Sequence, residues 1–185
     1  MRSIVFGVVF ALLVFVGHPV TATIPVPPNG VACDFVTGGG YIVGENSGTG
    51  PPETLAEGAK GNFGVGGGVR NGAFWGHLEY SDHSTNPPFK VHGTSVTGYF
   101  PGLTENSRTI TGTADVTGVG NVDYTVEVTD NAEPGRGQDK FSIKVGAYTA
   151  SGVIAGGNIQ LHKPNASNTP PPDQSCLAPV ATRAQ

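Results

Sequence analysis

The feature that most constrains the fold is a strict alternation of apolar and polar residues on both sides of one polar loop. Residues 122–129 read V-D-Y-T-V-E-V-T, and residues 141–145 read F-S-I-K-V. A period of two residues is typical of a half-buried β-strand. The two runs therefore predict an antiparallel hairpin whose connection is the loop of residues 130–141.

Shorter alternating runs fill most of the remaining chain. They are separated by glycine, proline and asparagine, and the pair Asn71-Gly72 is typical of a two-residue hairpin turn. With 29 glycines, 15 prolines and 13% charged residues, the composition disfavours helix. Sheets with one apolar face must close or stack. We expect an all-β fold, an antiparallel meander that closes into a small barrel, with a β-sandwich as the alternative.

Glycines inside the predicted strands indicate irregular places. The run of residues 38–40 lacks side chains and predicts a bend or bulge in the first strand. Gly93 lies where the alternation changes parity, which predicts a bulge that resets the register. Residues 44–60 form the longest stretch without a pattern, and loops of that length are often functional.

The two ends of the chain predict export. Residues 1–22 combine Arg2, an apolar run at residues 4–16 and the small residues V-T-A, which predicts a signal peptide cleaved after Ala22. A proline-rich linker follows at residues 23–32, then the β domain at residues 33–163, and a disordered tail at residues 164–185. No later segment approaches the length of a membrane helix. We expect a secreted, extracellular protein without a membrane span in the mature chain.

An oxidising compartment lets cysteines pair. Cys33 and Cys176 are the two cysteines of the chain, and they flank nearly all of the patterned sequence. The prediction is a disulfide that ties the tail to the first strand, with free thiols or an intermolecular link as the alternative. The formal net charge of -4 provides no basic field, so we expect no nucleic-acid partner.

The loop of residues 130–141 concentrates groups that bind cations. Asp130, Glu133 and Asp139 offer carboxylate oxygens on a glycine- and proline-rich turn, which is the chemistry that calcium accepts. The spacing matches no EF-hand. The alternative is a hairpin loop braced by its own hydrogen bonds and by an ion pair with Arg136. Calcium is the one cofactor that the sequence suggests.

A second group of residues predicts a ligand surface. Trp75 is expected to point outward from its strand, because Phe74, Leu78 and Tyr80 form the better core face. An aromatic ring flanked by hydrogen-bonding groups is typical of sugar binding. The surface would comprise the side chains of Trp75, His77, Glu79, Asp82 and His83.

Two other interpretations of these residues stay open. Zinc could be held by His77, His83 and His92 with a carboxylate. The Trp75 face could also simply pack against the long loop of residues 44–60.

The sequence contains no nucleophile elbow and no metalloprotease motif. We therefore expect no enzyme but a secreted, non-catalytic structural or interaction module whose partner is an extracellular glycan or protein. The alternative is a calcium- or carbohydrate-binding module. A third candidate is a lipocalin-like carrier of small apolar ligands, which requires a hollow barrel.

Six short motifs resemble a family of secreted bacterial all-β domains that follow choice-of-anchor-type domains in cell-surface proteins. The resemblance covers residues 36–162. Its most specific segments are D-N-A-E-P-G at residues 130–135 and G-G-N-I-Q-L-H at residues 156–162; the others are V-T-G-G-G, G-N-F-G-V, K-V-H-G-T and D-K-F-S-I. It implies a bacterial origin and an extracellular accessory module, and it assigns no catalytic residue.

Overall fold

A computed structural model describes residues 30–44 and 54–177 of the chain. These residues form nine β-strands and no helix. The predicted signal peptide at residues 1–22 and most of the predicted linker at residues 23–32 lie outside the described residues. Within the described residues no helix has the length and apolar character needed to cross a membrane.

Most strands follow one another with short connections, as the turn residues predict. The strand bounds are β1 (Phe35–Val43), β2 (Lys60–Arg70), β3 (Ala73–Asp82), β4 (Phe89–Pro101), β5 (Ser107–Val116), β6 (Gly120–Thr129), β7 (Lys140–Val145), β8 (Tyr148–Val153) and β9 (Gly156–His162). The β1–β2 and β6–β7 connections are longer.

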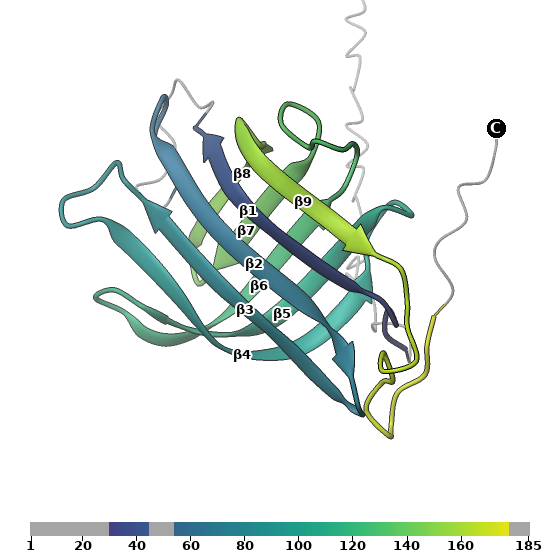
Figure 1. Ribbon diagram of the computed structural model, residues 1–185. Helices are drawn as coiled ribbons and strands as arrows, with labels where there is room; N and C mark the ends of the chain where they lie inside the picture. Colours follow the sequence, from purple (N-terminus) through teal and green to yellow (C-terminus); the bar gives the residue numbers. More distant parts are fainter. Residues whose placement is uncertain (1–29, 45–53, 178–185) are drawn as a thin grey trace, which may run out of the picture.

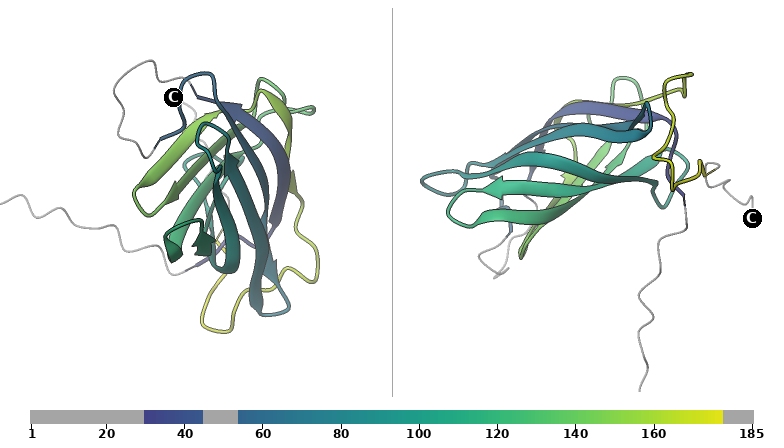
Figure 2. Two further views of the ribbon diagram at one scale, coloured as in Figure 1. Left: turned by 90° about the vertical axis from the view of Figure 1, so that its left-hand side faces the viewer. Right: turned by 90° about the horizontal axis from the view of Figure 1, so that it is seen from below.

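All nine strands belong to one antiparallel sheet in the order β8-β7-β6-β5-β4-β3-β2-β1-β9. The sheet is strongly curled into a half-barrel (Figure 1), and two further views show the same curl (Figure 2). The predicted all-β meander is confirmed. The alternative of a β-sandwich is wrong, because the described strands form one continuous sheet that curls around its own apolar face.

The chain itself connects the two edges of the sheet. After β8 it passes through Ile154, whose backbone N–H donates to the carbonyl of Asp139 at 3.0 Å. The next N–H, from Ala155, donates to the carbonyl of Tyr41 in β1 at 2.9 Å. The two-residue connection between β8 and β9 therefore links the two edges of the half-barrel.

The seam between β8 and β1 is filled by the described end of the long β1–β2 connection. Leu55 is buried in the core, and Thr54 forms an isolated parallel bridge with Thr149 of β8. Residues 45–53 of this loop lie outside the described residues. The described part of the loop therefore has a structural role.

Aromatic rings pack the interior. Phe63 of β2 stacks on Phe141 of β7 with ring centroids 4.0 Å apart, and Tyr80 of β3 lies 6.1 Å from the same ring. These rings belong to one continuous cluster of buried apolar side chains contributed by the described strands. Burial of apolar surface is the main stabilising contribution to such a fold.

The predicted disulfide between Cys33 and Cys176 is confirmed. The domain begins earlier than predicted, because Val31 and Ala32 are buried and Val31 bridges Cys176. Residues 164–177, predicted to be disordered, instead run along the molecule as an irregular strap. Asn168 is buried and donates to the carbonyl of Val69 at 2.9 Å. The disulfide ties the strap to the segment before β1 and this bond ties it to β2, which composition alone does not reveal.

Candidate functional site

The Asp139 side chain holds the loop between β6 and β7 in place. Its side chain is fully buried, and its Oδ1 accepts backbone N–H bonds from Asn131 at 2.9 Å and Ala132 at 3.2 Å. Its Oδ2 accepts the backbone N–H of Ile159 in β9 at 2.8 Å. One carboxylate therefore braces the loop and joins it to a strand that lies twenty residues further along the chain.

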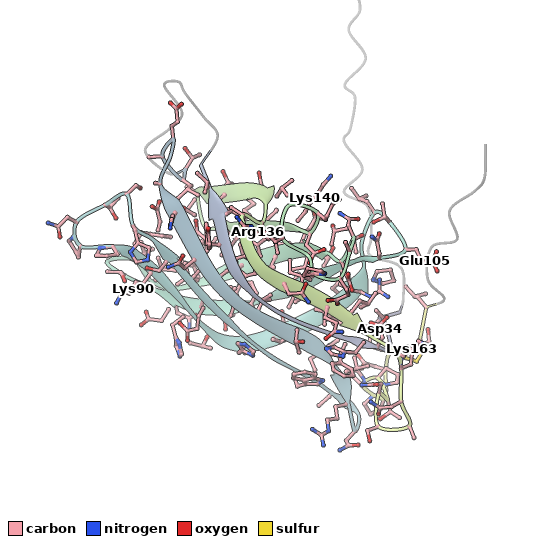
Figure 3. The ribbon with its side chains drawn as sticks, turned by 45° about the horizontal axis from the view of Figure 1, so that its top comes forward. Asp34, Lys90, Glu105, Arg136, Lys140 and Lys163 are labelled. Atoms are coloured by element: carbon pink, nitrogen blue, oxygen red, sulfur yellow. A yellow bond between two sulfur atoms is a disulfide. The ribbon has the colours of Figure 1, made fainter. Side chains whose placement is uncertain are left out.

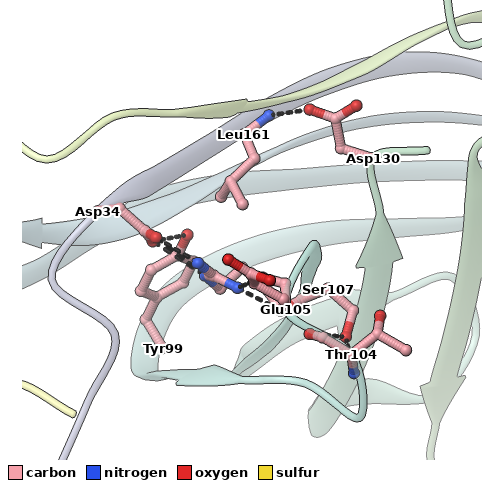
Figure 4. A network of polar contacts seen from close by, with 8 residues as sticks. Asp34, Tyr99, Thr104, Glu105, Ser107, Asp130 and Leu161 are labelled. Carbon is pink, nitrogen blue, oxygen red and sulfur yellow. Dashed lines mark hydrogen bonds and ion pairs between the residues drawn. The ribbon is translucent and has the colours of Figure 1, made fainter. Parts of the chain in front are cut away.

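Asp130 makes the second bond to the same strand. Its Oδ2 accepts the backbone N–H of Leu161 at 2.7 Å, and Figure 4 shows this bond. Ile159 and Leu161 are alternate residues of β9, which lies at the edge of the sheet and pairs only with β1. Unpaired N–H groups at a sheet edge invite pairing with other chains. The two carboxylates cap this edge.

Glu133 provides the third contact between this loop and β9. Its Oε2 accepts the side-chain N–H of Asn158 at 2.9 Å, and Asn158 Oδ1 accepts the backbone N–H of Gly135 at 2.5 Å. A Cβ atom on Gly135 would collide with the carboxylate of Asp139, so only glycine fits there. We call Asp130, Glu133 and Asp139, with the β9 groups that they bind, the carboxylate clamp.

The clamp changes the interpretation of the calcium candidates. Each of the three carboxylates already accepts hydrogen bonds from the protein, and no group of three metal-binding side chains occurs among residues 30–44 and 54–177. This arrangement favours a structural role over calcium binding. The proposed ion pair with Arg136 is wrong, because Arg136 forms no ion pair with any described residue.

Asp130 has a raised pKa. Partial burial is the largest cause, the N–H of Leu161 opposes it, and the negative charges of Asp139 and Glu133 add to it. A carboxyl group whose folded pKa lies above its ordinary value of 3.8 lowers stability above that folded pKa, and this cost disappears as pH falls toward 3.8.

Asp130→Asn is therefore expected to raise the free energy of unfolding at pH 7 slightly, by about 0.5 kcal/mol. The asparagine oxygen still accepts the N–H of Leu161, while the repulsion from the neighbouring carboxylates is removed. Urea unfolding between pH 3.5 and pH 7 measures the effect. The advantage over the wild type should shrink as pH falls; an advantage that grows toward acid would contradict this account.

The predicted ligand surface is divided by the structure. Trp75, His77 and Glu79 of β3 lie on the outer face, as expected. Asp82 does not join them, because it is the last residue of β3 and its alternation places it inside, with 1% of its surface exposed. His83 follows β3 on the surface, where its ring nitrogen lies 3.1 Å from the side-chain nitrogen of Asn62.

Asp82 instead belongs to a buried polar network. Its Oδ2 accepts the hydroxyl of Tyr148 at 3.0 Å, and its Oδ1 accepts the backbone N–H of Ser84 at 2.7 Å. The Tyr148 hydroxyl lies 2.8 Å from that of Tyr80. Burial raises the pKa of Tyr148 far above its usual value, so the phenol stays protonated and donates. Buried polar groups that are satisfied in this way stabilise one arrangement of the interior.

The zinc interpretation finds no support in the positions of the histidines. His92 pairs with Glu79 across the β3–β4 ladder at 2.5 Å, while the ring of His77 lies over Gly66 of β2. His83 lies beside Asn62, as described above. Each histidine therefore has a different neighbour.

The outer face carries an aromatic cluster that the sequence indicates only in part. Phe35 of β1 stacks on His162 of β9 with ring centroids 4.3 Å apart, and it lies 5.9 Å from the ring of Trp75 at an angle of 52°. Gly68 of β2 lies between Phe35 and Trp75, where a side chain would collide with Phe35. The alternation of β1 places Phe35 outward, and that signal was available in the sequence.

A pocket of about 320 Å³ opens beside these rings. It is lined by Phe35, Arg70, Trp75, Asn165, Ser167 and Asn168. The last three residues belong to the strap, so among the described residues the strap lies beside Trp75. Such a pocket combines apolar ring surface with hydrogen-bonding groups, as ligand sites do. We call it the aromatic pocket.

A second polar network lies near the start of β1 and was not predicted. Arg108 of β5 is buried and pairs with the carboxylate of Asp34, which also accepts the hydroxyl of Tyr99 at 2.8 Å (Figure 4). Arg108 Nη1 donates to the carbonyls of Glu105 and Ser107 at 2.8 and 2.6 Å. These charges are fully paired, which is the condition under which burial is tolerated. The network is structural.

Comparison with known proteins gives no relative from which a role can be transferred. No family model matches the chain, and no curated protein or solved structure matches it.

Proposed function

We propose that the chain is a secreted, non-catalytic interaction module that binds an extracellular carbohydrate at the aromatic pocket. The observation that carries this proposal is the ring cluster of Phe35, Trp75 and His162 beside a pocket with an arginine and amide and hydroxyl groups. Sugars present an apolar ring face and many hydroxyls, so they need both kinds of surface.

The interior supports binding outside rather than inside the barrel. A carrier of lipocalin type needs a hollow interior. Here the stacked rings of Phe63 and Phe141 and the phenols of Tyr80 and Tyr148 occupy the space enclosed by the described strands. These contacts favour the outer surface as the place where a ligand binds.

The placement of charge supports a partner other than nucleic acid. Lys90, Arg136 and Lys163 lie on separate parts of the surface (Figure 3), so their positive charges do not form one patch. The chain as a whole carries a formal charge of -4. Phosphate backbones are bound by clustered lysines and arginines. The disulfide between Cys33 and Cys176 suits an oxidising, extracellular environment.

The two motifs that most resemble secreted bacterial accessory domains meet in the clamp. These motifs, at residues 130–135 and 156–162, lie far apart in the sequence but bond to each other through Asp130, Glu133 and Asn158. These bonds give the motif pair a structural role. This agrees with a module that lacks catalysis.

Trp75→Ala is expected to weaken carbohydrate binding by about tenfold or more, because a stacked aromatic ring contributes on the order of 1.4 kcal/mol. A glycan array identifies the ligand, and calorimetric titration then compares the variants. His77→Ala is the matched control, since His77 lies two residues along the same face of β3. Equal binding by the wild type and Trp75→Ala, or no glycan bound by the wild type, would remove the proposal.

A further inference from the structure

We infer that the aromatic pocket selects acidic sugars, with the carboxylate of a uronic acid bound by Arg70. This inference rests on the proposed function and specifies its ligand class. Arg70 is the last residue of β2, its side chain is exposed, and it lines the pocket. A guanidinium group binds a carboxylate through two parallel N–H bonds.

Arg70 has no partner of its own in the described structure. The two ion pairs found among residues 30–44 and 54–177 are Asp34 with Arg108 and Glu79 with His92. No hydrogen bond from the Arg70 guanidinium to a described residue occurs. In a chain with an excess of acidic residues, a cation left unpaired beside a pocket is available for an anionic ligand.

The remaining polar groups of the pocket also favour a ligand that accepts hydrogen bonds. The side-chain oxygen of Asn165 already accepts the backbone N–H of Ser167 at 2.9 Å, and that of Asn168 accepts the backbone N–H of Asn165 at 2.8 Å. The amide N–H groups of Asn165 have no acceptor among the described residues. The pocket therefore presents more free donors than acceptors, and a carboxylate is the ligand group that only accepts.

The two sides of the pocket are held to each other. Asn71, next to Arg70, donates its backbone N–H to the carbonyl of Ser167 at 2.9 Å, and Gly72 donates to the carbonyl of Thr169 at 3.1 Å. The turn that carries Arg70 and the strap that carries Asn165 are thus connected before any ligand arrives. Preorganisation of this kind reduces the entropy lost on binding.

A uronic acid matches both features of the pocket. Its pyranose ring offers C–H groups to the rings of Phe35 and Trp75, and its carboxylate extends from the ring edge toward a cation. A neutral hexose offers the same ring but only a hydroxyl at that position. Replacing the carboxylate by a hydroxyl loses a charge-assisted pair, and we expect about tenfold weaker binding.

The test uses polygalacturonate, alginate and hyaluronan, each with its carboxyl-reduced form, in calorimetric titrations against the full mature chain. The wild type should bind at least one acidic polymer about tenfold or more tightly than its reduced form. Arg70→Gln should remove this preference, whereas Arg136→Gln, a change at another exposed arginine, should keep it.

The outcomes separate the two proposals. Equal binding of acidic and carboxyl-reduced forms, with loss in Trp75→Ala, would overturn the acidic preference and leave the carbohydrate function standing. Equal weakening by Arg70→Gln and Arg136→Gln would also overturn it, because the attraction would then be a general charge effect. No binding of acidic or neutral glycans by the wild type would overturn both.

Discussion

Asp139→Asn is expected to lower the free energy of unfolding by about 3 kcal/mol. The Asp139 carboxylate is fully buried and accepts three backbone N–H bonds, from Asn131, Ala132 and Ile159. An asparagine keeps one acceptor oxygen but points N–H groups at a backbone donor. At least one buried N–H then loses its partner, and β9 loses one of its bonds to the loop. Urea unfolding at pH 7 measures the difference.

Asp123→Asn provides the matched control for this change. Asp123 lies near the start of β6, the strand that leads into the same loop, but its side chain is exposed, and the same loss of charge there should shift stability by less than about 0.5 kcal/mol. Asp139→Asn should also contrast with Asp130→Asn, which is expected to stabilise slightly. A change at Asp139 no larger than that at Asp123 would show that the clamp does not hold the fold.

Removing the disulfide is the second change with a large expected effect. The bond joins residues 143 positions apart, and in the chain-entropy model a loop of that length contributes up to about 5 kcal/mol. The double variant Cys33→Ser with Cys176→Ser should therefore melt far below the wild type. The measurement is thermal unfolding followed by circular dichroism, with and without a reductant.

The reductant separates the bond from the substitutions themselves. It should lower the melting temperature of the wild type toward that of the double variant and leave the double variant unchanged. The bonds of Ser175 and Leu177 to Val31 lie beside the disulfide, so this end of the strap should loosen when the disulfide is removed. A wild-type melting temperature that does not respond to the reductant would contradict this account.

The strands were predictable because burial on alternate sides of a strand is a local property. The turn at Asn71-Gly72 is confirmed, with positive φ angles of 51° and 80° at its two residues. The bulge at Gly93 is also confirmed, since the β4–β5 register shifts between Gly93 and Ser95. Each of these features depends only on residues that are neighbours in the sequence.

The glycine run at residues 38–40 predicted a bend or a bulge in the first strand. The bulge is wrong for a non-local reason, because β1 keeps an unbroken register with both β2 and β9. A Cβ on Gly40 would collide with the carbonyl of Gly156, and Gly157 has a φ of 103°. The glycines allow β9 to approach β1 closely, and β9 lies more than a hundred residues away in the sequence.

The candidate sites also divide into features that depend on neighbouring residues, which were predicted, and features that depend on distant residues, which were not. Concentrated carboxylates marked the loop of residues 130–141, but the N–H groups that they bind lie on β9, which the local pattern does not reveal. The outward direction of Trp75 was correct, because alternation decides it. Asp82 was assigned to the turn and to the wrong face, since β3 continues through it. The strap beside Trp75 was predicted to be a disordered tail, because its fixed position depends on the disulfide and on Asn168.

The carboxylates of the clamp hold the β9 edge. Amide hydrogen exchange at Ile159 and Leu161, followed by NMR, measures how firmly. Edge N–H groups that face away from β1 exchange quickly unless they are bonded. We expect slow exchange at both amides in the wild type and fast exchange at Ile159 in Asp139→Asn. Fast exchange at both amides in the wild type would contradict this role of the carboxylates.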